Sequence, residues 1–147
     1  MPERRQLTFQ TLDEVMPEVA RLLEGYTVVG KWSLAQILHH LAITIRSTAR
    51  PASDVPPATS EQTAIHKRFF ALDRFPDGRP APPPFDPPQG LDPLVEAPSL
   101  DRALERFASA TGPFPAHPVI GPLSGEEWAR FHAMHAAHHL GFAVPTK

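Results

Sequence analysis

The residues best suited to chemistry lie in one segment near the C-terminus, where histidines recur at helical spacing. An α-helix turns by about 100° per residue, so residues three or four positions apart share a face. One such stripe consists of Trp128, His132, His135, His139 and Phe142. Imidazole nitrogens bind transition metals at about 2.0–2.1 Å, and two histidines one helical turn apart can converge on one ion. The spacing therefore predicts a metal site that contains His135 and His139.

Histidines on a helical face also have ordinary explanations. They can be stacked or hydrogen-bonded core residues, or they can be solvated, and a single H-x-x-x-H pair often arises by chance. Three histidines occupy this stripe, where a bundle helix normally carries leucine or isoleucine. This density favours the metal interpretation, and a further ligand can come from a facing helix.

Two more histidines, His39 and His40, lie in a helix that is expected to begin after Ser33. The pair Ser33 and Gln36 has the spacing of a capping box. The apolar face of this helix consists of Leu34, Ile37, Leu38, Leu41 and Ile45. By helical angle His40 lies about 60° from Ile37, whereas His39 lies about 100° from Leu38. His40 is the better candidate to face inward, and a boundary histidine in contact with water is the alternative.

Four main helices are predicted, over residues 11–25, 33–50, 99–112 and 124–141. Pro17 either kinks the first helix or moves its start. Ser99 is the expected N-cap of the third helix, and a capping box at Ser124 begins the last one. No segment alternates with period two for long enough to predict a strand. Four helices with one long connection indicate an all-α fold, a four-helix bundle.

The connection between the second and third helices, about residues 50–98, is rich in proline. The segment Arg79–Pro88 cannot form a regular helix or an inner strand and is expected to be an extended, polyproline-like crossover. A short helical piece is expected over residues 60–72. Four phenylalanines, Phe69, Phe70, Phe75 and Phe85, indicate that the crossover packs over the domain as a lid or a dimer contact. A free linker is the alternative.

Composition limits the class of protein. A chain of 147 residues is expected to form a single domain over residues 1–147. The net charge of −2 and the pI near 6.4 give no electrostatic footprint for nucleic acid. The absence of cysteine excludes disulfides, thiolate ligands and a nucleophilic cysteine from this chain. No signal peptide and no apolar run of membrane-spanning length is evident, so a cytoplasmic protein is expected.

Two segments resemble a known superfamily. The segment Trp32–Ala42 is similar to the second helix of DinB-like (DinB/YfiT-like) bundle proteins, in which a metal-binding histidine precedes a leucine. The segment His135–Phe142 resembles their fourth-helix signature, a histidine pair four residues apart. A branch of unknown function is the most similar, because its members begin with a segment like Arg5–Val15 and end with one like His117–His135. The resemblance leaves out the proline-rich crossover.

The resemblance implies a divalent metal, Zn or Ni, on His40, His135 and His139. It leaves three roles open for His132: a fourth ligand, a partner of a ligand, or a proton carrier. We take His132 as the candidate catalytic acid or base. Phe142 stands where the superfamily often has glutamine, which makes the surroundings of the site more apolar here.

Three neutral imidazoles leave a position open on the ion, as a catalytic site requires. The leading hypothesis is a metal-dependent thiol transferase or hydrolase that acts on a small-molecule substrate. Because the chain has no cysteine, a low-molecular-weight thiol would come from outside. The alternative is a non-catalytic helical bundle without a physiological metal, used for binding or for forming a homodimer. Haem ligation by one histidine is a third option, which no attachment motif supports.

Overall fold

The computed structural model describes residues 3–77 and 85–147, which are mostly helical. A 3-10 turn, η1, precedes the first α-helix and covers Leu12–Glu14. The α-helices are α1 (Val15–Leu23), α2 (Leu34–Thr48), α3 (Ser60–Phe70), α4 (Pro93–Ser109) and α5 (Gly125–Leu140). Two short strands, β1 (Tyr26–Val28) and β2 (Ala143–Pro145), complete the fold.

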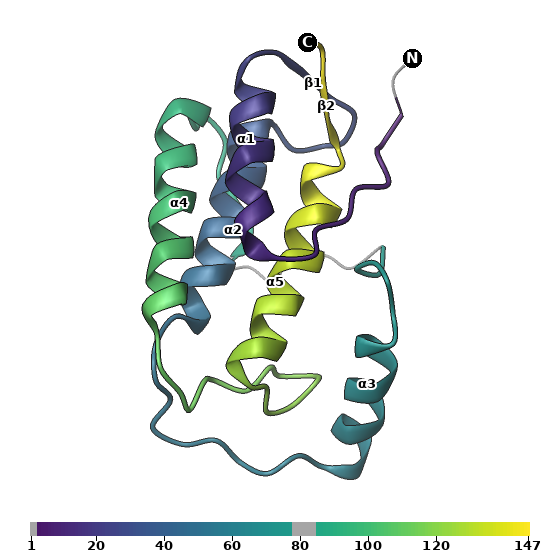
Figure 1. Ribbon diagram of the computed structural model, residues 1–147, viewed down its shortest axis with the longest axis vertical. Coiled ribbons are helices and arrows are strands. Elements are labelled where there is room, and N and C mark those ends of the chain that lie inside the picture. The colour runs from purple at the N-terminus through teal and green to yellow at the C-terminus, as the bar shows by residue number, and fades with distance from the viewer. Residues whose placement is uncertain (1–2, 78–84) are drawn as a thin grey trace.

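Four of the helices pack together, and α3 lies apart from them (Figure 1). Helix α2 has its largest interface with α4 and also contacts α5, while α1 contacts both α4 and α5. The N- and C-terminal ends of the chain lie at the same end of the molecule (Figure 1). The helix that carries His40 therefore lies against the helix that carries His135 and His139.

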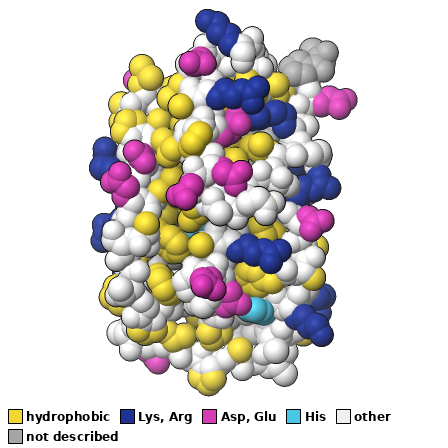
Figure 2. All heavy atoms as spheres, in the orientation of Figure 1, with side chains coloured by type: hydrophobic (Ala, Val, Ile, Leu, Met, Phe, Trp, Pro, Cys, Tyr) yellow, Lys and Arg dark blue, Asp and Glu magenta, His cyan; other side chains and the backbone are white. Residues whose placement is uncertain are grey.

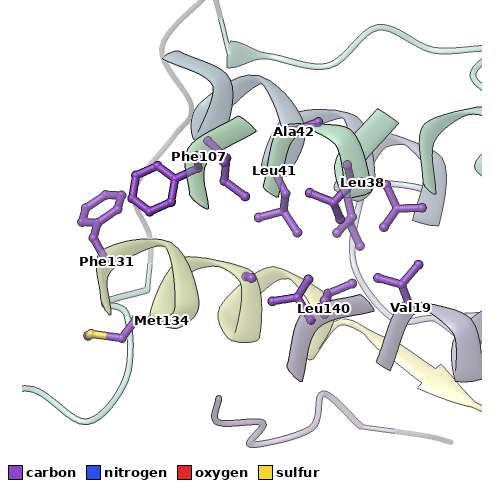
Figure 3. Close-up of a cluster of buried hydrophobic side chains, with 14 of the residues drawn as sticks. Val19, Leu38, Leu41, Ala42, Phe107, Phe131, Met134 and Leu140 are labelled. Carbon is purple, nitrogen blue, oxygen red and sulfur yellow. The ribbon is translucent and has the colours of Figure 1, made fainter. Parts of the chain in front are cut away.

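The core lies between these helices and holds the site in place. Every residue of the predicted apolar face of α2 is at most 2% exposed, which confirms the periodicity argument. Figure 3 shows Leu38 and Leu41 of α2 pointing toward Leu140 of α5 and Val19 of α1. Burial of a leucine side chain contributes about 1.5–3 kcal/mol. The relative position of α2 and α5 is thus fixed by apolar packing that does not involve the histidines.

Helices α1 and α4 start elsewhere than expected. The predicted first helix divides into η1 and α1, so that Pro17 falls in the first turn of α1. Backbone N–H groups in the first turn have no helical acceptor, so a proline is tolerated there. Helix α4 begins at Pro93 and not at Ser99, because the Asp92 side chain caps it by accepting a hydrogen bond from the backbone of Leu94. Pro98 lies inside α4 and has no N–H to donate to the Leu94 carbonyl, one turn earlier. Leu94 is 70% exposed, so water can reach this carbonyl.

The two strands correct the expectation of a chain without strands. They pair antiparallel, with Thr27 opposite Val144, and a further hydrogen bond joins the Val29 amide to the Phe142 carbonyl at 2.8 Å. Each strand has only three residues, which is too short for a period-two pattern to be recognised. The pair links the segment before α2 to the segment after α5.

The crossover packs against other helices before residue 78, through Phe69 and Phe75, and after residue 84, through the carbonyls of Phe85 and Pro87. Helix α3 confirms the predicted short helical piece. The Phe69 and Phe75 rings lie 5.4 and 5.5 Å from the Phe131 ring of α5, centre to centre. These contacts argue against a free linker around α3. Residues 79–84 of the expected polyproline-like segment lie outside the described residues.

On the face drawn in Figure 2, basic and acidic side chains are interspersed and do not gather into a patch of one sign. Among the helices of residues 3–77 and 85–147, none combines the length and the apolar character that crossing a membrane would take.

Candidate metal centre

Three histidines from α2 and α5 meet at one point inside the protein. The Nε2 atom of His135 lies 3.1 Å from Nε2 of His40 and 3.1 Å from Nε2 of His139. One ligand atom from each residue fits within a span of 4.8 Å. Around a tetrahedral ion with bonds of about 2.0–2.1 Å, neighbouring nitrogens are roughly 3.3 Å apart. The arrangement that periodicity and resemblance predicted, with His40 and not His39 facing inward, is present.

The hydrogen bonding of His40 presents a lone pair to this point. Its Nδ1 lies 2.8 Å from the Phe85 carbonyl oxygen, which can only accept, so Nδ1 carries the proton and Nε2 is bare. A metal-binding histidine commonly has its second ring nitrogen fixed by a carbonyl in this way. No sequence pattern indicated Phe85 as the partner, because the contact joins the crossover to α2.

The short distances among the three rings fit a shared cation. His135 Nε2 can offer one N–H at most, and that proton can serve only one of its two 3.1 Å contacts. One of the two contacts is then left without a hydrogen bond, unless a cation lies between the nitrogens. His135 Nδ1 is also buried without a hydrogen-bond partner among the described residues. The donor set therefore fits a divalent ion that accepts nitrogen ligands.

Burial keeps these rings neutral, which is the form that binds metal. Desolvation lowers the pKa of His40, and it lowers the pKa of His139 to about 2 with help from the nearby His40. The pKa of His135 lies well below its ordinary value of 6.5, because of burial first and the neighbouring imidazoles second. A proton does not compete effectively with a metal ion for these nitrogens near neutral pH.

Aromatic rings surround the three histidines. Trp32, just before α2, stacks on His139 at 5.3 Å with an angle of 20° between the planes, and its ring lies 4.9 Å from His40. The Phe75 ring is 5.0 Å from His135. These contacts restrict the orientation of the imidazoles and exclude water from their edges.

The centre opens onto a cavity of about 780 Å³ between α2, α5 and the segment before α5. All three histidines line it, together with aromatic side chains that include both tryptophans of the chain. A cavity of this size accommodates a small organic molecule. Thr44, Ser47 and Thr48 continue the lining along α2 from His40 toward the C-terminal end of the helix.

His132, the expected acid or base, lies behind the cavity wall. It is 0% exposed and is not among the residues that line the cavity. Its Nε2 is 2.8 Å from Oγ1 of Thr48, which does line the cavity, and its ring stacks on Trp128. Burial lowers the pKa of His132 to about 3. The structure thus places His132 one turn from His135 and separates it from the cavity by Thr48.

The remaining histidines have other partners. Nδ1 of His39 lies 2.8 Å from the carboxylate of Glu96 on α4, and Glu96 is only 8% exposed. His138 lines the cavity, and its Nδ1 accepts a hydrogen bond from Arg4 at 2.7 Å. His117 also lines the cavity and accepts at Nδ1 from the amides of Val119 and Ile120. Sequence periodicity could not find the partners of His39 and His138, because these partners come from other parts of the chain.

The fold and the site define a mainly helical protein with three clustered histidines, two of them buried and one partly buried, that could hold a metal ion. The chain belongs to a family described as "Protein of unknown function (DUF1569)", which matches residues 1–146. Comparison with the curated proteins gave no match, and comparison with the solved structures gave none.

Proposed function

We propose that this protein is a divalent-metal-dependent enzyme, of the thiol-transferase or hydrolase type, that acts on a small molecule. The observation that supports this most directly is the convergence of three imidazole ligand atoms in the wall of a cavity. Structural zinc sites are usually closed by four protein ligands, whereas a catalytic site keeps a position open. Within the described residues, only these three groups come together at this point.

In this proposal His40, His135 and His139 hold Zn²⁺ or Ni²⁺. The ion would lower the pKa of a water molecule or of an external thiol at its open position. The Phe85 carbonyl fixes the tautomer of His40 through Nδ1. Trp32 and Phe75 hold the imidazoles in orientation and keep bulk water from the ligand atoms.

His132 has a positioning role in this proposal, through Thr48. The Thr48 hydroxyl lies 2.9 Å from the Ile45 carbonyl, to which it donates, so it accepts from Nε2–H of His132. Two hydrogen bonds thus fix the direction of a hydroxyl that lines the cavity. A ring that is 0% exposed reaches a substrate only through such a neighbour.

Metal content tests the proposal. Protein purified without a histidine tag should carry close to one equivalent of Zn or Ni by elemental mass spectrometry, and His135→Ala should lose it. A chelator should lower the melting temperature of the wild type but not that of the variant, because a ligand that binds only the folded state stabilises it. Unchanged metal content in His135→Ala would refute the ligand assignment.

A non-catalytic binding module is the second candidate, and the apolar cavity favours it. Its aromatic lining suits an apolar ligand whether or not a metal is bound. This function predicts that purified protein carries no stoichiometric metal and that chelators leave its melting temperature unchanged.

We also propose that the packed helices have the DinB-like arrangement. The support is the similarity of Trp32–Ala42 and His135–Phe142 to the superfamily's signatures, together with the meeting of His40, His135 and His139. An experimental structure would test it, because DinB-like proteins share a defined order and direction of the four helices.

A further inference from the structure

We propose that the cavity binds an elongated molecule with an apolar body and a terminal carboxylate, and that Arg50 binds this carboxylate. Only the role of the histidine end of the cavity rests on the proposed metal-dependent function. The role of Arg50 can be tested without metal.

The charges that line the cavity have one sign. Lys31 and Arg50 both line it, and no aspartate or glutamate is among the described residues that do. Neither cation forms an ion pair within residues 3–77 and 85–147, although Arg4, Arg5 and Arg21 each do. A cavity with unneutralised cations and no carboxylates attracts an anion and disfavours a cationic ligand.

The other polar groups along α2 do not provide obvious donors for an anion. The hydroxyls of Thr44, Ser47 and Thr48 donate to backbone carbonyls of their own helix at 2.8, 2.7 and 2.9 Å. The Thr48 oxygen already accepts from His132, and the lone pairs of Thr44 and Ser47 suit a ligand that donates better than a carboxylate. On this wall of the cavity, the guanidinium of Arg50 is the group suited to an anion, and its planar fork matches a carboxylate in two parallel hydrogen bonds.

The position of Arg50 sets the length of the ligand. Helix α2 ends at Thr48, eight residues after His40, so a rise of 1.5 Å per residue separates these two by about 12 Å, and Arg50 follows two residues beyond the end of the helix. The wall between His40 and Arg50 carries aromatic side chains from other elements, among them Trp128 and Phe131. A molecule that reaches from the histidines to Arg50 therefore needs an extended apolar body between its reactive end and its carboxylate.

Lys31 belongs to the other end of the cavity. It precedes Trp32, whose ring packs on the metal-ligand candidates His40 and His139. Its ammonium is a strongly hydrated point charge on a flexible chain, which gives less geometric selection than a guanidinium. We therefore assign the carboxylate to Arg50 and only a general electrostatic attraction to Lys31.

The first experiment uses chelator-treated, metal-free protein and two probes of equal length, octanoate and 1-octanol. Trp32 and Trp128 are the only tryptophans of the chain and both line the cavity, so their fluorescence reports binding. Octanoate should bind more tightly than octanol to the wild type. Because Arg50 is exposed, the expected loss of octanoate affinity in Arg50→Gln is moderate, about fivefold. Octanol affinity should not change in that variant.

Arg102→Gln is the matched control, since Arg102 is an exposed arginine of α4 that does not line the cavity. It should keep the wild-type preference for octanoate. The proposal is overturned if Arg50→Gln keeps that preference, or if Lys31→Gln loses as much of it as Arg50→Gln does. It is also overturned if octanoate and octanol bind the wild type equally well.

The second experiment examines the metal end with cobalt-loaded protein and 8-mercaptooctanoate. A thiolate-to-cobalt absorption band should appear with 8-mercaptooctanoate. In the wild type this band should saturate at a lower concentration of 8-mercaptooctanoate than of 8-mercaptooctanol. In Arg50→Gln the two probes should saturate at similar concentrations. Equal saturation of both probes in the wild type would overturn the anion assignment. If the protein takes up no cobalt, the proposed metal function fails, while the octanoate result still decides the role of Arg50.

Discussion

The Nε2 atoms of His40 and His135 lie 3.1 Å apart, although 95 positions separate the two residues in the chain. Apolar packing between α2 and α5, and not the histidines themselves, brings the two helices together. The site is thus formed by the fold before any ion binds, and substitutions of single histidines should separate metal binding from folding.

His39 and His40 form a matched pair for this test. His40→Gln should abolish stoichiometric metal binding, because it removes an Nε2 that faces His135. His39→Gln should leave metal content unchanged, since His39 faces Glu96 on α4. Elemental analysis of both variants checks this, and loss of metal in His39→Gln would contradict the assignment.

The two tryptophans should respond differently to a quenching metal. Trp32 packs directly on His40 and His139, whereas Trp128 stacks on His132. Addition of Ni²⁺ or Co²⁺ to metal-free protein should quench the emission, because Trp32 is in contact with two ligand rings. Trp32→Phe should remove most of the quenching, and Trp128→Phe should retain it. Titrations followed by steady-state fluorescence measure this, and the reverse pattern would place the ion elsewhere.

Thr48→Val should destabilise the protein through His132. The substitution keeps the shape of the side chain but leaves the buried Nε2–H of His132 without an acceptor. An unpaired buried polar group costs about 1–3 kcal/mol. Thr48→Ser keeps the hydroxyl and should lose much less. Urea unfolding of the two variants compares these costs, and equal losses would show that the hydroxyl is not the cause.

Metal-free protein should lose stability in acid through His132. The pKa of this residue is about 3 in the folded state because of burial, against 6.5 as its ordinary value. A lowered folded pKa means that the unfolded chain takes up the proton first. The stabilising contribution of the neutral ring is therefore complete above pH 6.5 and is lost as the pH falls from 6.5 toward 3. The loss amounts to about 1.4 kcal/mol per pH unit.

His132→Leu supplies the comparison for this pH dependence. Its free energy of unfolding, measured in urea at pH 7 and at pH 5, should fall less on acidification than that of the wild type. The two proteins should differ in the pH dependence of the free energy of unfolding by about one proton, since burial alone lowers the pKa of His132. An identical slope in both proteins would show that His132 is not the group that titrates.

The sequence predicted the histidines better than their surroundings. Residues at helical spacing share a face whatever the tertiary structure, so periodicity placed His135 and His139 on one face of α5 and favoured His40 over His39 on α2. The resemblance to DinB-like proteins supplied the grouping of these three residues. Neither helical spacing nor the resemblance reveals that Thr48 separates His132 from the cavity, because that contact joins residues 84 positions apart.

Two features escaped prediction for local physical reasons. Helix α4 starts before Pro98, because the Asp92 cap and the exposed position of Leu94 make an internal proline tolerable. The strands β1 and β2 have three residues each, and their hydrogen bonds depend on segments at opposite ends of the chain. Short-range sequence patterns therefore predict neither the start of α4 nor the pairing of β1 with β2.

The pairing of β1 with β2 has a consequence for how an ion is exchanged. The strand pairing connects the segment before α2 to the segment after α5, so backbone hydrogen bonds hold together the two helices that carry the ligands. Loading and release should then require only side-chain rotation, with Trp32 as the nearest obstacle, and should proceed far faster than global unfolding. Cutting the chain after Phe142 would remove this strand pairing and leave the apolar packing between α2 and α5 to hold the ligands at their separation.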